Sequence, residues 1–212
     1  MRSLLFFGLS SVLAADAAKP HPHQGKLAPI TRKPASTALS AEDLATLGRG
    51  QPVEKQVQYE GGGRALAIQD IRAPADVVWN TILAYDRYPD WVAHVETTEI
   101  YAKRGDHWLI AFELSLFGMG VDYFTDNLIR REEGWMSWTL DYSRKSDVDD
   151  MAGYWLVTEV SQAPAVTRLE YASDLRIRWA PDFMVRYLSR DALTEGTAWV
   201  KQRAEQAAGT GG

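Results

Sequence analysis

The 212-residue chain contains no cysteine. It therefore cannot form a disulfide or a zinc site with cysteine ligands, and it lacks the cysteine that a lipid-modified bacterial amino terminus requires. Its four histidines show no ligand spacing with one another or with a carboxylate pair on one helix face. We therefore expect no metal and no cofactor, and we expect structural or solvent-exposed roles for His21, His23, His94 and His107.

Negative charge exceeds positive charge, with 28 aspartates and glutamates against 23 lysines and arginines. The formal net charge is −5, and no run of lysine and arginine forms a basic patch, which argues against general binding to nucleic acid or to anionic membranes. Sequence signatures of a serine nucleophile elbow and of a phosphate-binding loop are missing. The glycines of Glu60–Arg64 instead indicate a hairpin turn. Asp147, Asp149 and Asp150 have an incomplete calcium-loop spacing, which is typical of a charged turn.

The apolar run Leu4–Leu13 is too short for a transmembrane helix, which needs about 20 residues. Arg2 precedes this run and small residues follow it at Ala14, Ala15, Ala17 and Ala18, a pattern that predicts a secretory signal peptide over residues 1–18. A buried amino-terminal helix is the alternative. On the signal-peptide interpretation, the protein is exported and is periplasmic or secreted.

Residues 19–39 contain four prolines and few large apolar side chains. This composition predicts a proline-rich leader that is either disordered or held as a strap with little structure of its own. We expect a single folded domain over residues 40–206 and a flexible tail over residues 207–212.

Aromatic residues are plentiful, at 11% of the chain with eight tryptophans. The patterns predict a short helix from Ser40, two strands joined by a glycine turn, two short helical pieces, six further strands and a long helix over 181–206. Because no helix separates the last six strands, they must be joined as antiparallel hairpins. The expected fold is α+β, with a curved antiparallel sheet wrapped around the carboxy-terminal helix and an apolar space between them.

Several motifs now point to a known family. Ala73-Pro74, Val78-Trp79, the stretch Asp86-x-Tyr88-Pro89-x-Trp91 and Gly153-Tyr154-Trp155 resemble the START-like polyketide cyclase and coenzyme Q-binding superfamily, which has the helix-grip fold. The resemblance extends over about Val53–Arg203. It implies binding of a sterol, quinone, phospholipid or polyketide-like molecule in the cavity between sheet and helix.

Candidate site residues follow from the strand alternation and the last helix. We expect the cavity wall to include Trp108, Phe112, Tyr171, Leu175, Met184 and Leu188, with Glu113 and Tyr123 as polar candidates. Catalytic residues cannot be named from these patterns. A structural corner is predicted at Asp86, Tyr88, Pro89 and Trp91, with Asp86 as a helix N-cap, Pro89 in the first helical turn and the rings seating both helices against the sheet.

The sequence favours a binding protein for an apolar small molecule or lipid over an enzyme. A polyketide cyclase or aromatase, with dehydratase-like chemistry in the same cavity, is the alternative. No nucleic-acid partner is expected, transient membrane contact is left open, and the oligomeric state is not indicated.

Overall fold

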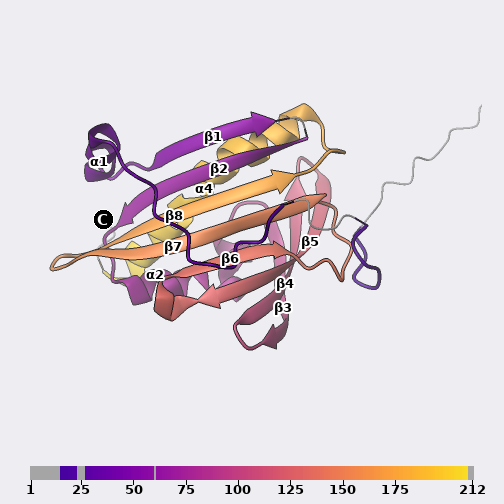
Figure 1. The fold of residues 1–212 in the computed structure, drawn as a ribbon, viewed down its shortest axis with the longest axis horizontal. Coiled ribbons are helices and arrows are strands. Elements are labelled where there is room, and N and C mark those ends of the chain that lie inside the picture. Colours follow the sequence, from indigo (N-terminus) through magenta and orange to yellow (C-terminus); the bar gives the residue numbers. More distant parts are fainter. Residues whose placement is uncertain (1–14, 23–26, 60, 210–212) are drawn as a thin grey trace, which may run out of the picture.

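A computed structural model describes residues 15–22, 27–59 and 61–209, without the side chains of residues 58, 59, 182 and 184–195. The described residues form an eight-stranded antiparallel sheet. A long helix lies behind this sheet in the view of Figure 1. The strands lie in the order β1-β2-β8-β7-β6-β5-β4-β3. They span Val53–Tyr59 (β1), Gly62–Ile71 (β2), Val95–Arg104 (β3), His107–Leu116 (β4), Met119–Arg130 (β5), Trp135–Leu140 (β6), Asp150–Gln162 (β7) and Ala165–Arg176 (β8).

The helices occupy four places in the chain. Before the sheet comes α1 (Ala41–Gly48), and between β2 and β3 come α2 (Ala75–Ile82), η1 (Tyr85–Arg87) and α3 (Tyr88–Trp91). A short η2 (Arg131–Glu133) follows β5, and α4 (Asp182–Ala207) ends the fold. The predicted α+β helix-grip architecture is confirmed. None of the helices in the described part of the chain is both long and apolar enough to span a membrane.

Short connections between successive strands determine how the sheet is ordered. Every neighbouring strand pair is antiparallel, and β3 to β8 follow one another as hairpins because the loops between them are too short for a crossover. The predicted glycine turn joins β1 to β2, and Gly61 there has a φ of +71°. Helix α4 lies against β2 and α2, so it covers one face of the sheet, which we call the concave face.

The main core fills the space between the concave face, the short helices and the second half of α4. Val78, Ile82 and Val200 are fully buried there, at 0% exposure. Apolar burial of this kind stabilises a fold by about 25 cal/mol per Å². Further buried members of the core are Ile71, Ala73, Trp79, Tyr85, Tyr88, Ile110, Met136, Trp138, Trp155, Val157, Leu169, Trp199 and Ala204.

Residues 27–39, part of the proline-rich leader, run as an extended strap across the opposite, convex face (Figure 1). They contain no helix or strand of their own. Their polar backbone groups bond to strand side chains: the Leu27 amide donates to Asp150, the Ser137 hydroxyl donates to the Ile30 carbonyl, and the Thr37 amide donates to Glu170. The sequence left open whether the leader is disordered or held as a strap, and residues 27–39 form a strap.

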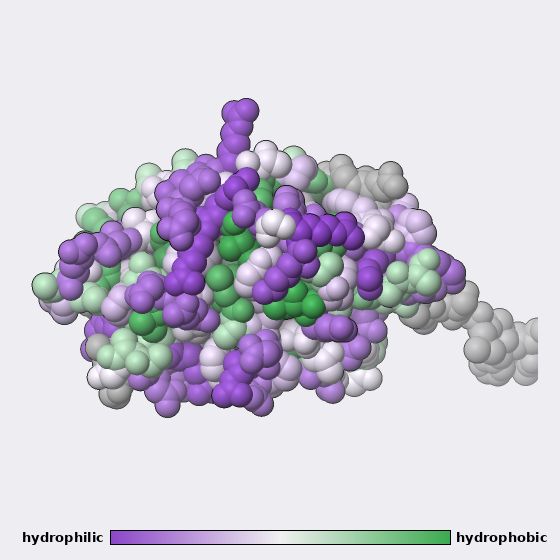
Figure 2. Space-filling view, turned by 90° about the horizontal axis from the view of Figure 1, so that it is seen from below, coloured by the Kyte–Doolittle hydropathy of each residue, from purple (hydrophilic) through white to green (hydrophobic). Residues whose placement is uncertain are grey.

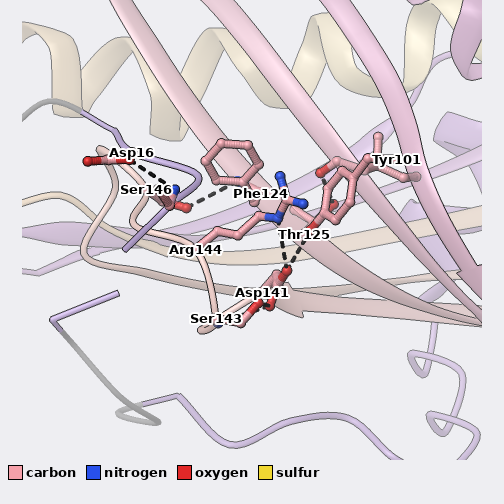
Figure 3. A network of polar contacts seen from close by, with 10 residues as sticks. Asp16, Tyr101, Phe124, Thr125, Asp141, Ser143, Arg144 and Ser146 are labelled. Atoms are coloured by element: carbon pink, nitrogen blue, oxygen red, sulfur yellow. Dashed lines mark hydrogen bonds and ion pairs between the residues drawn. The ribbon is translucent and has the colours of Figure 1, made fainter. Parts of the chain in front are cut away.

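A polar network on the convex face fixes the loop between β6 and β7 (Figure 3). Asp141 accepts hydrogen bonds from the Tyr101 hydroxyl at 2.6 Å and from the amide and hydroxyl of Ser143. The Arg144 guanidinium lies 3.8 Å from the centre of the Tyr101 ring. Lys145 pairs with Asp16 through two backbone hydrogen bonds, so a short segment before the strap is joined to the same loop.

Candidate ligand-binding cavity

A cavity of about 240 Å³ lies between the concave face of the sheet, the corner after α2 and helix α4. Its described wall is mostly apolar, which is typical of small-molecule sites. Strands β2 and β4 to β8 contribute the floor, and Gly196 and Trp199 contribute from α4. Apolar members of the wall are Tyr85, Phe112, Leu114, Leu116, Val121, Met136, Trp138, Val148, Met151, Trp155, Tyr171 and Leu175.

Two groups of aromatic rings line this floor. Phe112 on β4 stacks on Tyr123 on β5, with centroids 5.0 Å apart and planes 12° apart. Tyr171 on β8 stacks on Trp138 at 5.6 Å and contacts Trp155 at 4.6 Å. Because aromatic faces are flat and rigid, the two groups present a surface suited to a planar apolar ligand.

Gly153 makes one of these stacks possible. It pairs with Trp138 across β6 and β7, and a Cβ atom at this position would lie 2.2 Å from the Trp138 ring and 2.5 Å from the Ala172 carbonyl oxygen. The ring therefore lies flat against the backbone of Gly153. Glycine in a strand often marks such a close approach.

The cavity also contains tyrosine hydroxyl groups. The Tyr88 hydroxyl donates to the Ile82 carbonyl at 2.6 Å and is thereby occupied. Among the described residues, the hydroxyls of Tyr85 and Tyr123 have no hydrogen-bond partner. Burial raises the pKa of both groups well above the usual 10, so both stay protonated and can donate to a ligand.

Burial also raises the pKa of the Tyr171 hydroxyl, and a hydrogen bond with Ser173 opposes that shift in part. On β5, the Asn127 amide donates to the Thr125 hydroxyl at 2.8 Å and to the Trp108 carbonyl at 3.2 Å. The polar side chains of the described wall are therefore hydroxyls, the Asn127 amide and, at the exposed edge, the His94 imidazole. The described wall contains no carboxylate, lysine or arginine, which favours a neutral ligand.

The wall becomes exposed at Ala93 and His94, between α3 and β3. His94 is joined to β4 by two contacts with the Ser115 backbone: the Ser115 amide donates to the His94 carbonyl at 2.9 Å, and His94 Nδ1 lies 3.1 Å from the Ser115 carbonyl oxygen. This end of the cavity is its mouth. His94 adopts a left-handed conformation there, with a φ of 66°.

Four of the predicted cavity residues line the cavity: Phe112, Tyr123, Tyr171 and Leu175. Trp108 faces the same side of β4 but lies beyond the cavity, where its ring packs near Tyr85 and beneath the Lys103 ammonium at 3.4 Å. The side chains of the other two apolar candidates, Met184 and Leu188, lie outside the described residues.

Glu113 requires a correction. Side chains alternate along β4, so Glu113 lies on the convex face opposite Phe112, where it is exposed and pairs in register with Asp122 and Thr97. Both faces of β4 carry apolar residues, and the alternation alone could not identify the concave one.

The corner agrees with the prediction in part. Pro89 lies in the first turn of α3, and Tyr88 is buried. Asp86 is not an N-cap: it is exposed within η1, and Arg87 occupies the N-cap of α3 without a side-chain hydrogen bond. Trp91 is half-buried, 6.2 Å from the Trp199 ring, so it forms the outer edge of the corner.

Sequence reasoning missed several wall residues. Trp138 and Met136 on β6 line the cavity, but every residue of β6 except Thr139 is buried, so no alternation marks its inner face. Tyr85, directly before the predicted corner, is also part of the wall. The signal that could have located Trp155 is its place beside Gly153 in the family motif.

The histidines lie in separate places. His21 is buried at 3% exposure, with its ring nitrogens near the Asp149 carbonyl and the Ser146 amide. His107 is exposed, 2.8 Å from Asp126, and His23 lies outside the described residues. Within residues 15–22, 27–59 and 61–209, no group of three or more potential ligands is placed to hold a metal ion.

Comparison with known proteins places this geometry in context. The model of the family described as polyketide cyclase/dehydrase and lipid transport matches residues 63–205. No curated protein sequence matches the chain.

Among solved structures, the Zhui aromatase/cyclase from Streptomyces sp. R1128 is 16% identical with a TM-score of 0.56, covering 76% of this chain and 99% of its own. A START superfamily protein from Mycobacterium smegmatis is 17% identical with a TM-score of 0.55, covering 74% and 98%. The protein TTHA0849 from Thermus thermophilus is 16% identical with a TM-score of 0.59, covering 68% and 99%. At these identities the likeness concerns the fold alone.

Proposed function

Because the chain belongs to the polyketide cyclase/dehydrase and lipid transport family, we propose that it binds a neutral, mainly apolar small molecule in the cavity between the sheet and α4. The observation that carries this proposal is that the hydroxyls of Tyr85 and Tyr123 line the cavity without a hydrogen-bond partner among the described residues, in a wall that is mostly aromatic and aliphatic. A folded protein gains no stability from such hydroxyls, whereas a ligand with an acceptor oxygen would satisfy them.

The wall also limits the size and shape of the ligand. Flat rings at Phe112 and Tyr123, and at Trp138 and Tyr171, favour a molecule with a planar portion. Affinity would come from apolar burial, at about 25 cal/mol per Å², and orientation from hydrogen bonds to a carbonyl or ether oxygen. Quinones and aromatic polyketides have this chemistry, and so do ring-containing lipids.

A titration with Nile red tests the proposal, because this dye is neutral, planar and carries a carbonyl oxygen. We expect saturable binding with a blue-shifted emission. Ser173→Phe, which places a ring on the cavity floor, should abolish saturable binding. Thr97→Phe, which adds the same ring to the exposed convex side of β3, should leave it intact. Equal binding by the two variants would contradict the proposal.

The enzyme alternative has less support from the described residues. A cyclase needs a group that accepts or donates protons beside the substrate. The predicted carboxylate, Glu113, lies on the convex face, and the protonated hydroxyls of Tyr85 and Tyr123 are poor bases. His94 lies only at the exposed edge of the wall, where its Nδ1 is engaged with the Ser115 carbonyl oxygen at 3.1 Å. We therefore prefer binding to catalysis as the function of this cavity.

We further propose that the protein is exported, on the strength of the amino-terminal sequence Met1–Ala18. The intact mass of the protein recovered from the periplasm or the medium tests this directly. We expect the mass of a chain cleaved among Ala14–Ala18. Recovery of the full 212-residue mass in the cytosolic fraction alone would contradict export.

A further inference from the structure

Three large aromatic side chains are exposed at the end of the sheet where the cavity has its mouth. Phe117 is 57% exposed in the turn between β4 and β5, Trp179 is 43% exposed between β8 and α4, and Phe183 is 47% exposed in the first turn of α4. Strands β4 and β8 run in the same direction, so all three residues lie at one end. We call them the aromatic rim.

The rim joins two elements that border the cavity. The Phe117 ring meets the Phe183 ring edge-to-face, with centroids 5.2 Å apart. Leu116, directly before Phe117, is 1% exposed and lines the cavity. An apolar surface therefore continues from the solvent-exposed rim into the ligand-binding space.

Backbone conformation indicates that the rim is not incidental. His94 and Phe117, with φ values of 66° and 52°, are the non-glycine residues with positive φ in the described chain. Both lie at the mouth, connected through Ser115. Phe117 and Gly118 occupy a two-residue hairpin turn with both φ values positive, where asparagine and glycine are normally preferred. A bulky residue in this conformation costs free energy and commonly marks a functional position.

We propose that the aromatic rim is the surface through which the protein docks on a lipid bilayer. A bilayer is the partner that best fits a protruding turn, because exposed rings can enter the boundary between headgroups and acyl chains without a complementary pocket. Trp179 suits this role, since its indole N–H already donates to the Asp147 carbonyl at 2.6 Å while its ring stays exposed.

Charge specifies the kind of bilayer. Arg178 beside the rim is paired with Asp149 at 3.1 Å, and the whole chain is acidic. The attraction is therefore apolar rather than electrostatic, and a zwitterionic membrane suffices.

Other exposed apolar residues, Leu44, Val57 and Val160, lie on three different elements. Figure 2, which views the molecule from the side of β3, shows hydrophobic side chains scattered among hydrophilic ones.

The absence of cysteine allows a direct test with the full chain, because one introduced cysteine is a unique labelling site. Gly120→Cys lies beside the turn, and its Cβ would meet nothing within 4 Å. Labelled there with nitrobenzoxadiazole, the protein should show a blue shift with phosphatidylcholine vesicles. The same label at Val160→Cys, on the hairpin at the other end of the sheet, should remain in water. The apolar Leu4–Leu13 segment is common to both variants.

Rim substitutions then separate docking from folding. Phe117→Asn suits the turn better and should raise the melting temperature. Combined with Phe183→Ser in the Gly120→Cys background, it should weaken vesicle partitioning at least about tenfold, because two rings no longer leave water. Unchanged partitioning, or a label at position 120 that stays in water, would overturn the proposal. Light scattering without vesicles gives a further test. If the protein is a dimer that shields the label at position 120 from water, a second copy of the chain covers the rim and the proposal is wrong. Nile red binding is measured separately, so loss of docking and loss of ligand binding are distinguishable.

Discussion

Residues on the two faces of β8 make different kinds of contact. Tyr171 and Leu175 face the cavity and contact aromatic and aliphatic side chains, whereas Arg168 and Glu170 face outward. Arg168 forms a bidentate ion pair with Asp70 at 2.7 and 2.8 Å, and Glu170 binds the strap. The concave face leaves space and, among the described residues, tyrosine hydroxyls without a hydrogen-bond partner. On the convex face, the charged groups of Arg168 and Glu170 are paired within the protein. This difference separates the part of the sheet that can accept a ligand from the part that stabilises the fold.

The largest expected effect concerns the close packing of the concave face at Gly153. Gly153→Ala should lower the free energy of unfolding by about 3 kcal/mol, because the new methyl group would lie inside the contact with the Trp138 ring. Gly120→Ala is the matched control, since its methyl group meets no atom within 4 Å, and it should change stability by less than about 0.5 kcal/mol. Urea unfolding measures both. Equal stability of the two variants would mean that the Trp138 ring does not lie over residue 153.

On the convex face, Glu170→Gln should cost about 2 kcal/mol, because a buried carboxylate that accepts from the Thr37 amide and hydroxyl and from the Tyr154 hydroxyl loses its charge. Glu170 is 3% exposed, so water cannot replace these bonds well. Hydrogen exchange of the Thr37 amide should accelerate while Nile red affinity stays the same. If Nile red affinity falls under conditions in which the variant is fully folded, the two faces are not independent.

Tyr123→Phe should have the opposite profile. Removing a hydroxyl without a partner among the described residues should leave stability unchanged, while affinity for a carbonyl-bearing ligand falls by about fivefold to tenfold, or about 1 kcal/mol. Fluorescence titration measures the affinity and thermal unfolding the stability. A stability loss with unchanged affinity would show that this hydroxyl serves the fold and not the ligand.

The smallest expected effect is on the acid sensitivity of the convex face. Burial raises the pKa of Asp141, but hydrogen bonds from Ser143 and Tyr101 and the charge of Arg144 lower it more, so its pKa in the folded protein lies below the usual 3.8. The resulting stability is present above about pH 3.8 and is lost as the pH falls through the folded-state pKa. Melting temperatures between pH 6 and pH 2 should therefore fall less steeply for Asp141→Asn than for the native protein. Parallel curves would remove Asp141 from this role.

The sequence predicted the fold well, because its order of elements left only hairpin connections. It located Tyr171 and Leu175 because polar and apolar residues alternate on β8. On β4 and β6 the alternation fails for physical reasons. Glu113 was misplaced because both faces of β4 carry apolar residues.

On β6 the strap covers the convex side, where the Ser137 hydroxyl bonds the Ile30 carbonyl, so both faces are buried. No local pattern reveals that a distant proline-rich segment makes this contact. The left-handed backbone of Phe117 and His94 at the mouth is likewise set by turn geometry and long-range hydrogen bonds.

The proposal that the concave cavity holds a neutral ligand can be tested on the protein as its own cells make it. Native mass spectrometry of the protein purified from its own organism tests this claim most directly, with Ser173→Phe prepared in parallel. We expect the native protein to carry one small molecule per chain, released by organic solvent, and Ser173→Phe to carry none. A bare chain in both samples, or the same bound molecule in both, would contradict it.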